Sequence, residues 1–101
     1  MLLAKPYVSA LGISEKKSRS AKIEWNISNF EHFNESRHQI KCSLKDPKLE
    51  KEIICAKPEP KNNHALTGLQ PNTHYEFIVN LITNKTDNRT SIPFTTLGES
   101  K

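Results

Sequence analysis

Four asparagines stand in acceptor sequences for N-linked glycosylation, which have the form Asn-x-Ser/Thr with x other than proline. They are Asn26, Asn34, Asn84 and Asn88. The Asn, Ser and Thr content of the chain predicts about 1.4 such sequences by chance, so four is an excess. We expect these asparagines in loops or on an outward strand face, where a glycan fits, and we interpret them as the mark of a secreted or cell-surface protein.

The two cysteines, Cys42 and Cys55, flank the turn sequence Asp-Pro-Lys-Leu-Glu at 46–50. Antiparallel pairing centred near Lys48 and Leu49 sets the cysteines opposite one another. A disulfide that closes a loop of this length contributes about 3 kcal/mol to stability. We favour this bond because the sequons indicate an oxidising compartment. The alternative is two free cysteines that pack in the core as small hydrophobic residues.

Histidines and carboxylates do not combine into a catalytic or metal-binding motif. The histidines lack the short spacing of a zinc site; they are His32, His38, His64 and His74. The sequence has no glycine-flanked serine elbow and no phosphate-binding loop. Asp46 and Asp87 fall in expected turns, where aspartate bonds to nearby backbone. We therefore predict no enzymatic activity, no metal and no cofactor.

The basic residues outnumber the acidic residues by fifteen to eleven, which gives a net charge of +4 and favours acidic partners. Lys16, Lys17 and Arg19 form a tight cluster, and a looser group, interrupted by acidic residues, runs from Lys45 to Lys61. Solvated loops explain both groups. The alternative is a polyanion- or carbohydrate-binding module with a sulfated glycan as partner. Nucleic-acid binding is not expected, because neither an aromatic stripe nor a basic helix accompanies the charge.

Short alternating runs bounded by Pro, Asn, Ser and Gly predict an all-β chain. The expected strands are residues 7–13, 21–27, 38–45, 51–56, 64–69, 73–83 and 91–97. In the second strand Ile23 and Trp25 alternate with polar residues, so Trp25 points inward and Asn26 outward. A chain of 101 residues with 35% hydrophobic residues forms one domain with a modest core, which favours two thin layers.

The ends of the chain give no targeting signal. Met-Leu-Leu-Ala is too short for a signal peptide, and no apolar run of about 18 residues is present to span a membrane. We expect a module from a longer protein, with residues 1–5 and 98–101 as linkers and without direct insertion into a membrane.

The sequence Leu-Gln-Pro-Asn-Thr-His-Tyr at 69–75 lies between two expected strands. Leu69 anchors the end of one strand in the core, and Pro71 stiffens the turn between the sheets. The hydroxyl of Tyr75 is placed to bond back to the backbone of that turn. Such a tyrosine corner satisfies polar groups that a buried crossover leaves without partners.

On these residues the chain resembles the fibronectin type III family over about residues 6–97. The matching residues are Pro6, Ile23, Trp25, Ile40, Cys42, Leu44, the 69–75 corner and the Pro-Phe-Thr-Thr sequence at 93–96. The resemblance implies a seven-stranded Greek-key β-sandwich, immunoglobulin-like, with strands A, B and E packed on strands C′, C, F and G. The chain departs from the family in its cysteines, which members usually lack, and in its long, irregular B–C loop.

The resemblance also implies that the B–C, C′–E and F–G loops cluster at one end of the sandwich. We expect this to bring the candidate partner residues Phe30, Phe33, Arg37 and Arg89 together. The alternative is that either phenylalanine folds back onto the core beside Trp25. The predicted function is a non-catalytic extracellular interaction and spacer module of a cell-surface receptor or adhesion protein, with receptor-type tyrosine phosphatases preferred. Its partner is then another protein or a neighbouring domain, and a purely structural spacer is a third reading.

Overall fold

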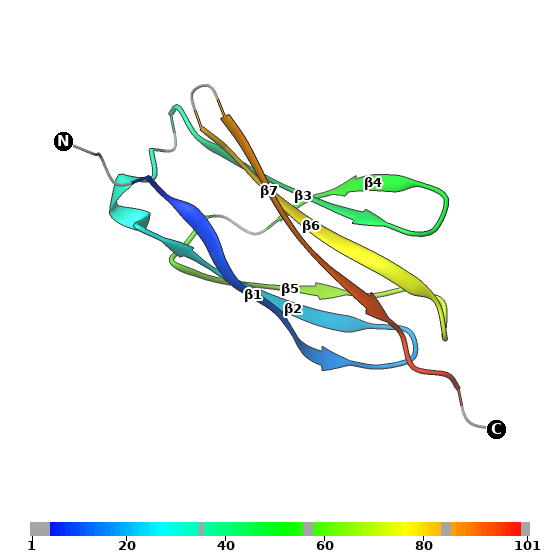
Figure 1. The fold of residues 1–101 in the computed structure, drawn as a ribbon. Coiled ribbons are helices and arrows are strands. Elements are labelled where there is room, and N and C mark those ends of the chain that lie inside the picture. The colour runs from blue at the N-terminus through cyan, green and yellow to red at the C-terminus, as the bar shows by residue number, and fades with distance from the viewer. Residues whose placement is uncertain (1–4, 35, 56–57, 84–85, 100–101) are drawn as a thin grey trace.

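The computed structural model describes residues 5–34, 36–55, 58–83 and 86–99. Within this part of the chain, seven strands and one turn of 3-10 helix follow one another (Figure 1). They are β1 (Tyr7–Lys16), β2 (Ala21–Ser28), η1 (Phe30–His32), β3 (Gln39–Lys45), β4 (Glu50–Ile53), β5 (Lys61–Leu66), β6 (His74–Thr83) and β7 (Thr86–Thr95). The prediction of an all-β chain with seven strands is confirmed.

The strands form two antiparallel sheets, ordered β1-β2-β5 and β4-β3-β6-β7, which pack face to face (Figure 1). This is the predicted sandwich. Alternation along β2 and β6 sends one face of each strand inward. Trp25 from β2 meets Phe77 from β6 across the core with ring centroids 5.6 Å apart. Both side chains are buried, so these two rings join the layers.

Four strands differ from the predictions by three or more residues at one end or both, and the first of them, β1, ends at Lys16 rather than 13. β5 covers Lys61–Leu66 rather than 64–69, because the polar Lys-Asn-Asn sequence pairs with β2. The buried Asn62 within it donates from Nδ2 to the Glu59 carbonyl, so its polar side chain is satisfied. β7 begins at Thr86 rather than 91, and β4 ends at Ile53 rather than 56. Backbone pairing with a neighbouring strand needs no apolar alternation, which explains the polar segments of β5 and β7; residues 54 and 55 are apolar and lie beyond β4.

The corner between β5 and β6 has a network of hydrogen bonds to the backbone. The amide of Gln70 donates to the Tyr75 hydroxyl at 2.9 Å, and the Thr73 hydroxyl donates to the Pro71 carbonyl at 2.9 Å. Leu69 is buried. The tyrosine hydroxyl therefore satisfies a backbone donor at a crossover between sheets, as a tyrosine corner does.

The sandwich is elongated, with extents of 59 × 24 × 21 Å. The N-terminal end of the described chain lies near η1 and the β6–β7 hairpin, and the C-terminal end lies at the far end of the long axis (Figure 1). Beyond β7 the chain is held in place: Leu97 accepts a hydrogen bond from the Asn72 amide at 3.0 Å and donates one to the Lys17 carbonyl at 3.2 Å. An ion pair between Arg19 and Glu99 adds a third contact.

Candidate functional site

The segment between β2 and β3, here called the tip loop (residues 29–38), begins with Asn29 in the left-handed conformation, φ 57°. Asparagine tolerates this conformation better than most residues. Its side chain donates to the Lys5 carbonyl at 3.1 Å, which ties the start of the loop to the chain before β1. The 3-10 turn η1 follows, and the Phe33 amide donates to the Phe30 carbonyl at 2.8 Å. The tip loop is therefore bonded to itself and to the sandwich.

Three rings gather in the tip loop and form the aromatic cluster: Phe30, Phe33 and His38. Phe30 and Phe33 stack with centroids 5.7 Å apart and planes within 5°. The rings of Phe33 and His38 meet edge to face at 5.6 Å. Phe30 packs against the core, while Phe33 is half-buried outside the core cluster. One phenylalanine thus folds back onto the core, and the other rests on the first.

The turn after the aromatic cluster is built around Asn34. Its amide donates to Nδ1 of His38 at 3.0 Å, and its carbonyl accepts from the amides of Arg37 at 2.9 Å and His38 at 2.7 Å. Its Oδ1 accepts from the amide of Ser36 at 3.0 Å and from the hydroxyl of Ser36 at 2.7 Å. These five bonds fix Asn34 next to the rings.

The two candidate arginines do not meet in the tip loop. Arg37 lies there with an exposed side chain. Arg89 lies on β7 opposite Asn80, on the outer side of its sheet, and its Nη2 bonds to Oε1 of Glu50 on β4 at 3.1 Å. Its strand position directs Arg89 to the sheet face, where its side chain is engaged with Glu50, so its joining the phenylalanines at the tip stays a prediction.

The outer face of the β4-β3-β6-β7 sheet, called the outer face below, has features that the sequence analysis did not single out. Ile78 points away from the core residues of β6, yet it is only 3% exposed. Oδ1 of Asn80 on the same face is buried without a hydrogen-bond partner. The Arg89–Glu50 ion pair joins the two edge strands over β6 and β3. The centre of the outer face is therefore covered, and the groups exposed around it are charged: Lys41, Arg89 and Glu50.

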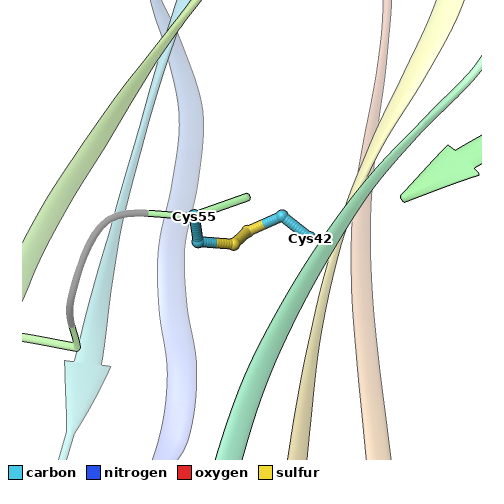
Figure 2. Close-up of a disulfide and its surroundings, with 2 residues drawn as sticks. All are labelled: Cys42 and Cys55. Atoms are coloured by element: carbon cyan, nitrogen blue, oxygen red, sulfur yellow. A yellow bond between two sulfur atoms is a disulfide. The ribbon is translucent and has the colours of Figure 1, made fainter. Parts of the chain in front are cut away.

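Cys42 and Cys55 form a disulfide, with their Cα atoms 5.8 Å apart. Figure 2 shows the two side chains pointing toward one another, Cys42 from β3 and Cys55 from the segment that follows β4. The predicted register is wrong: Cys42 lies opposite Ile53. Oδ1 of Asp46 accepts from the amides of Lys48 and Leu49 at 2.8 Å each, which fixes the turn at 46–49 and leaves Cys55 beyond the strand.

The sequons occupy different surroundings. Asn26 lies in the central strand β2, half-buried, on the side opposite to Trp25. Asn34 is exposed in the tip loop, and Asn88 is exposed on β7, opposite Leu81. Asn84 lies outside the described residues. The three described asparagines therefore reach solvent to different degrees.

The basic groups are partly neutralised. Lys17 pairs with Glu15 at 3.1 Å, and Arg19 pairs with Glu99. In the second group, Lys45 lies opposite Glu50 in the register of β3 and β4. Lys61 lies opposite Asn26 in the register of β5 and β2, at the other end of the sandwich. In the group at the β1–β2 turn, two of the three cations are thus paired with carboxylates.

The histidines lie in separate surroundings. Burial lowers the pKa of His64, whose ring stacks on Phe77 at 6.1 Å. Nδ1 of His74 lies 3.2 Å from the Thr95 hydroxyl, and His32 lies beside Glu31. In the described part of the chain, no three metal-ligating side chains gather in one place. No described helix has the length and apolar character needed to cross a membrane.

Solved structures with the same fold include three of different origin. The sensor domain of the anti-sigma factor RsgI4 of Pseudobacteroides cellulosolvens aligns with a TM-score of 0.68 and 24% identity, over 96% of this chain and 80% of that one. A computationally redesigned β-sandwich protein aligns with a TM-score of 0.73 and 18% identity, over 99% and 96%. A fibronectin type III domain of the human KIAA0970 protein aligns with a TM-score of 0.58 and 16% identity, over 93% and 75%. At these identities the likeness shows the fold alone.

The sequence comparisons identify the family. No curated protein matches the chain. The family model described as "Fibronectin type III domain" matches residues 6–97, which is nearly the whole chain. The chain therefore belongs to the fibronectin type III family of protein-interaction modules.

Proposed function

We propose that this domain is a non-catalytic protein-interaction and spacer module in the extracellular part of a cell-surface receptor or adhesion protein. The observation that carries the proposal is the Cys42–Cys55 disulfide within a fibronectin type III fold. Stable disulfides belong to oxidising compartments, and the four sequons agree with that setting. Receptor-type tyrosine phosphatases are the parent class that we prefer, because their modules combine a tyrosine corner with many sequons.

The outer face is the surface that we assign to the protein partner. None of the three described sequons lies on it: Asn26 is on the other sheet, Asn34 is in the tip loop, and Asn88 lies opposite the buried Leu81, on the other side of its sheet. Ile78 at its centre is covered, and the exposed groups around it are charged: Lys41 and the Arg89–Glu50 pair. Exposed charges of both signs on one face allow electrostatic complementarity with a protein partner. A face of this kind, without any of the three described sequons, is suited to contact another protein of the cell surface or matrix.

The spacer role is supported by the positions of the two ends of the described chain. They lie at opposite ends of the long axis (Figure 1). The Leu97 amide donates to the Lys17 carbonyl in the β1–β2 turn, and the Leu97 carbonyl accepts from the Asn72 amide in the β5–β6 corner. A module with these features keeps its neighbours apart at a fixed distance and limits their rotation.

The test is secretion of the domain from mammalian cells, followed by intact-mass measurement before and after glycosidase treatment and thiol alkylation. The proposal expects glycan mass and no alkylatable thiol. An unmodified chain with two reactive thiols refutes the extracellular setting. The polyanion alternative has no comparable support, since Lys17 and Arg19 are each paired with a carboxylate.

A further inference from the structure

In the tip loop, hydrogen bonds leave one polar atom of Asn34 available. Its amide, its carbonyl and Oδ1 are all bonded to Ser36, Arg37 or His38. Among the described residues, Nδ2 has no hydrogen-bond partner, and the residue is exposed. Nδ2 is the atom that carries an N-linked glycan. The turn therefore holds the asparagine in place and keeps the atom to be modified accessible.

The sequon at Asn34 differs from the other two that the structure describes. Only here does the hydroxyl of the sequon serine donate to the side chain of its own asparagine, at 2.7 Å. In the Asn26 sequon the Ser28 hydroxyl is instead engaged with Ser9, also at 2.7 Å. Asn88 lies in an extended strand. Among the described sequons, it is thus the one at Asn34 in which the asparagine side chain and the serine hydroxyl are hydrogen-bonded to one another in an exposed turn.

The aromatic cluster adjoins this asparagine. Phe33 is its chain neighbour, and the His38 ring bonds to the Asn34 amide while contacting Phe33. Phe30 supports Phe33 from the core side. The C–H face of a pyranose ring is apolar, so packing it on a half-exposed phenyl ring removes apolar area of both from water. The rings are therefore packed together next to the residue whose Nδ2 is the acceptor atom.

We propose that Asn34 carries an N-linked glycan and that the first N-acetylglucosamine packs against Phe33, so the aromatic cluster holds the domain's own glycan. In the transfer, Nδ2 of Asn34 forms a bond to C1 of the sugar. The bond between C1 and the pyrophosphate of a lipid-linked oligosaccharide donor breaks. The pyrophosphate leaves with the bonding electrons, and one Nδ2 proton is released. This inference rests on the extracellular setting proposed above.

The experiment uses a variant in which Asn34 is the sole sequon left, Asn26→Gln/Asn84→Gln/Asn88→Gln. This domain is secreted from mammalian cells and trimmed with an endoglycosidase to a single N-acetylglucosamine. The same variant from a bacterial periplasm, disulfide-bonded and without glycan, is the matched control. We expect full occupancy of Asn34 by peptide mass spectrometry. The Tm of the glycosylated form should be higher by roughly 3–8 °C.

Replacements of Phe33 decide the packing claim. Phe33→Leu should abolish the Tm difference between the glycosylated and unglycosylated forms, and Phe33→Tyr, which keeps a ring, should preserve it. An equal Tm difference in Phe33→Leu overturns the packing and leaves the cluster for a protein partner. If Asn34 carries no glycan in a secreted wild-type domain whose other sequons do carry glycans, this inference is refuted and the proposed function is not. A wild-type chain without glycans and with free thiols refutes the proposed function as well.

Discussion

Removal of the disulfide should cost the domain a large part of its stability. Cys42 is 1% exposed within the core, and its bond to Cys55 spans 13 residues of sequence. The bond holds the connection from β4 to β5, and β4 has only four residues with which to pair. Replacing both cysteines in Cys42→Ala/Cys55→Ala, or reducing the wild-type protein, releases this connection.

The magnitude follows from loop closure. For a loop of this length the chain-entropy model gives about 3 kcal/mol at room temperature. Small domains have a total free energy of unfolding of about 5–15 kcal/mol, so the loss is a substantial fraction. With an unfolding entropy of about 2.1 cal/mol/K per residue, it corresponds to a fall in Tm of roughly 14 °C for this chain.

Urea denaturation of the oxidised protein, the reduced protein and the double alanine variant measures this loss. The reduced protein should lose about 3 kcal/mol in the free energy of unfolding, and the double alanine variant should lose more, because it also removes the buried sulfur of Cys42. Their m-values should rise, because the unfolded chain without the bond exposes more surface. The reduced wild type keeps both sulfur atoms and so controls for side-chain volume. A loss below about 1 kcal/mol in the reduced protein contradicts the loop-entropy reasoning.

Three further predictions concern single residues. Tyr75→Phe removes the acceptor of the Gln70 amide and should lower the free energy of unfolding by about 1 kcal/mol in urea titrations; an unchanged value means that water replaces the hydroxyl. Burial lowers the pKa of His64, so the unfolded chain binds the proton more readily. Stability should therefore fall as the pH drops below about 6.5, and His64→Gln should show a smaller fall in Tm between neutral and acidic buffer, whereas an identical fall assigns the effect to other groups. Ala10 in β1 is a non-glycine residue at φ 54°, so Ala10→Gly should raise the free energy of unfolding by about 0.5 kcal/mol. A lower free energy of unfolding in the same urea assay shows that the conformation of Ala10 is not strained.

The alternating pattern predicts the parts of the fold that bury one strand face. In β2 the residues expected to point inward, which include Trp25 and Ile27, are the residues that are buried in the structure. The corner motif likewise predicts that the Tyr75 hydroxyl bonds to the backbone of the turn, and the structure shows this bond with the Gln70 amide. These features follow from local spacing, which a sequence displays directly.

Features that depend on contacts between distant strands were not predictable in the same way. The N-terminal half of β5 is polar, and its strand conformation comes from pairing with β2. The exact turn at 46–49 depends on side-chain bonds from Asp46, and a small shift there changes which residue faces Cys42. Arg89 reaches Glu50 only because four strands lie in one sheet. Each of these outcomes depends on register, which the spacing of apolar residues does not fix.

Binding of the secreted, glycosylated domain to cells tests the central claim most directly. We predict saturable binding that trypsin treatment of the cells removes and that heparin lyase does not. It should persist between about 50 and 200 mM salt. Charge reversal on the outer face, Lys41→Glu/Arg89→Glu, should abolish it, while Lys16→Glu/Lys17→Glu at the β1–β2 turn should not. Binding that heparin lyase removes, that weakens steeply over this salt range and that depends on Lys16 and Lys17 contradicts the claim and indicates a polyanion-binding module.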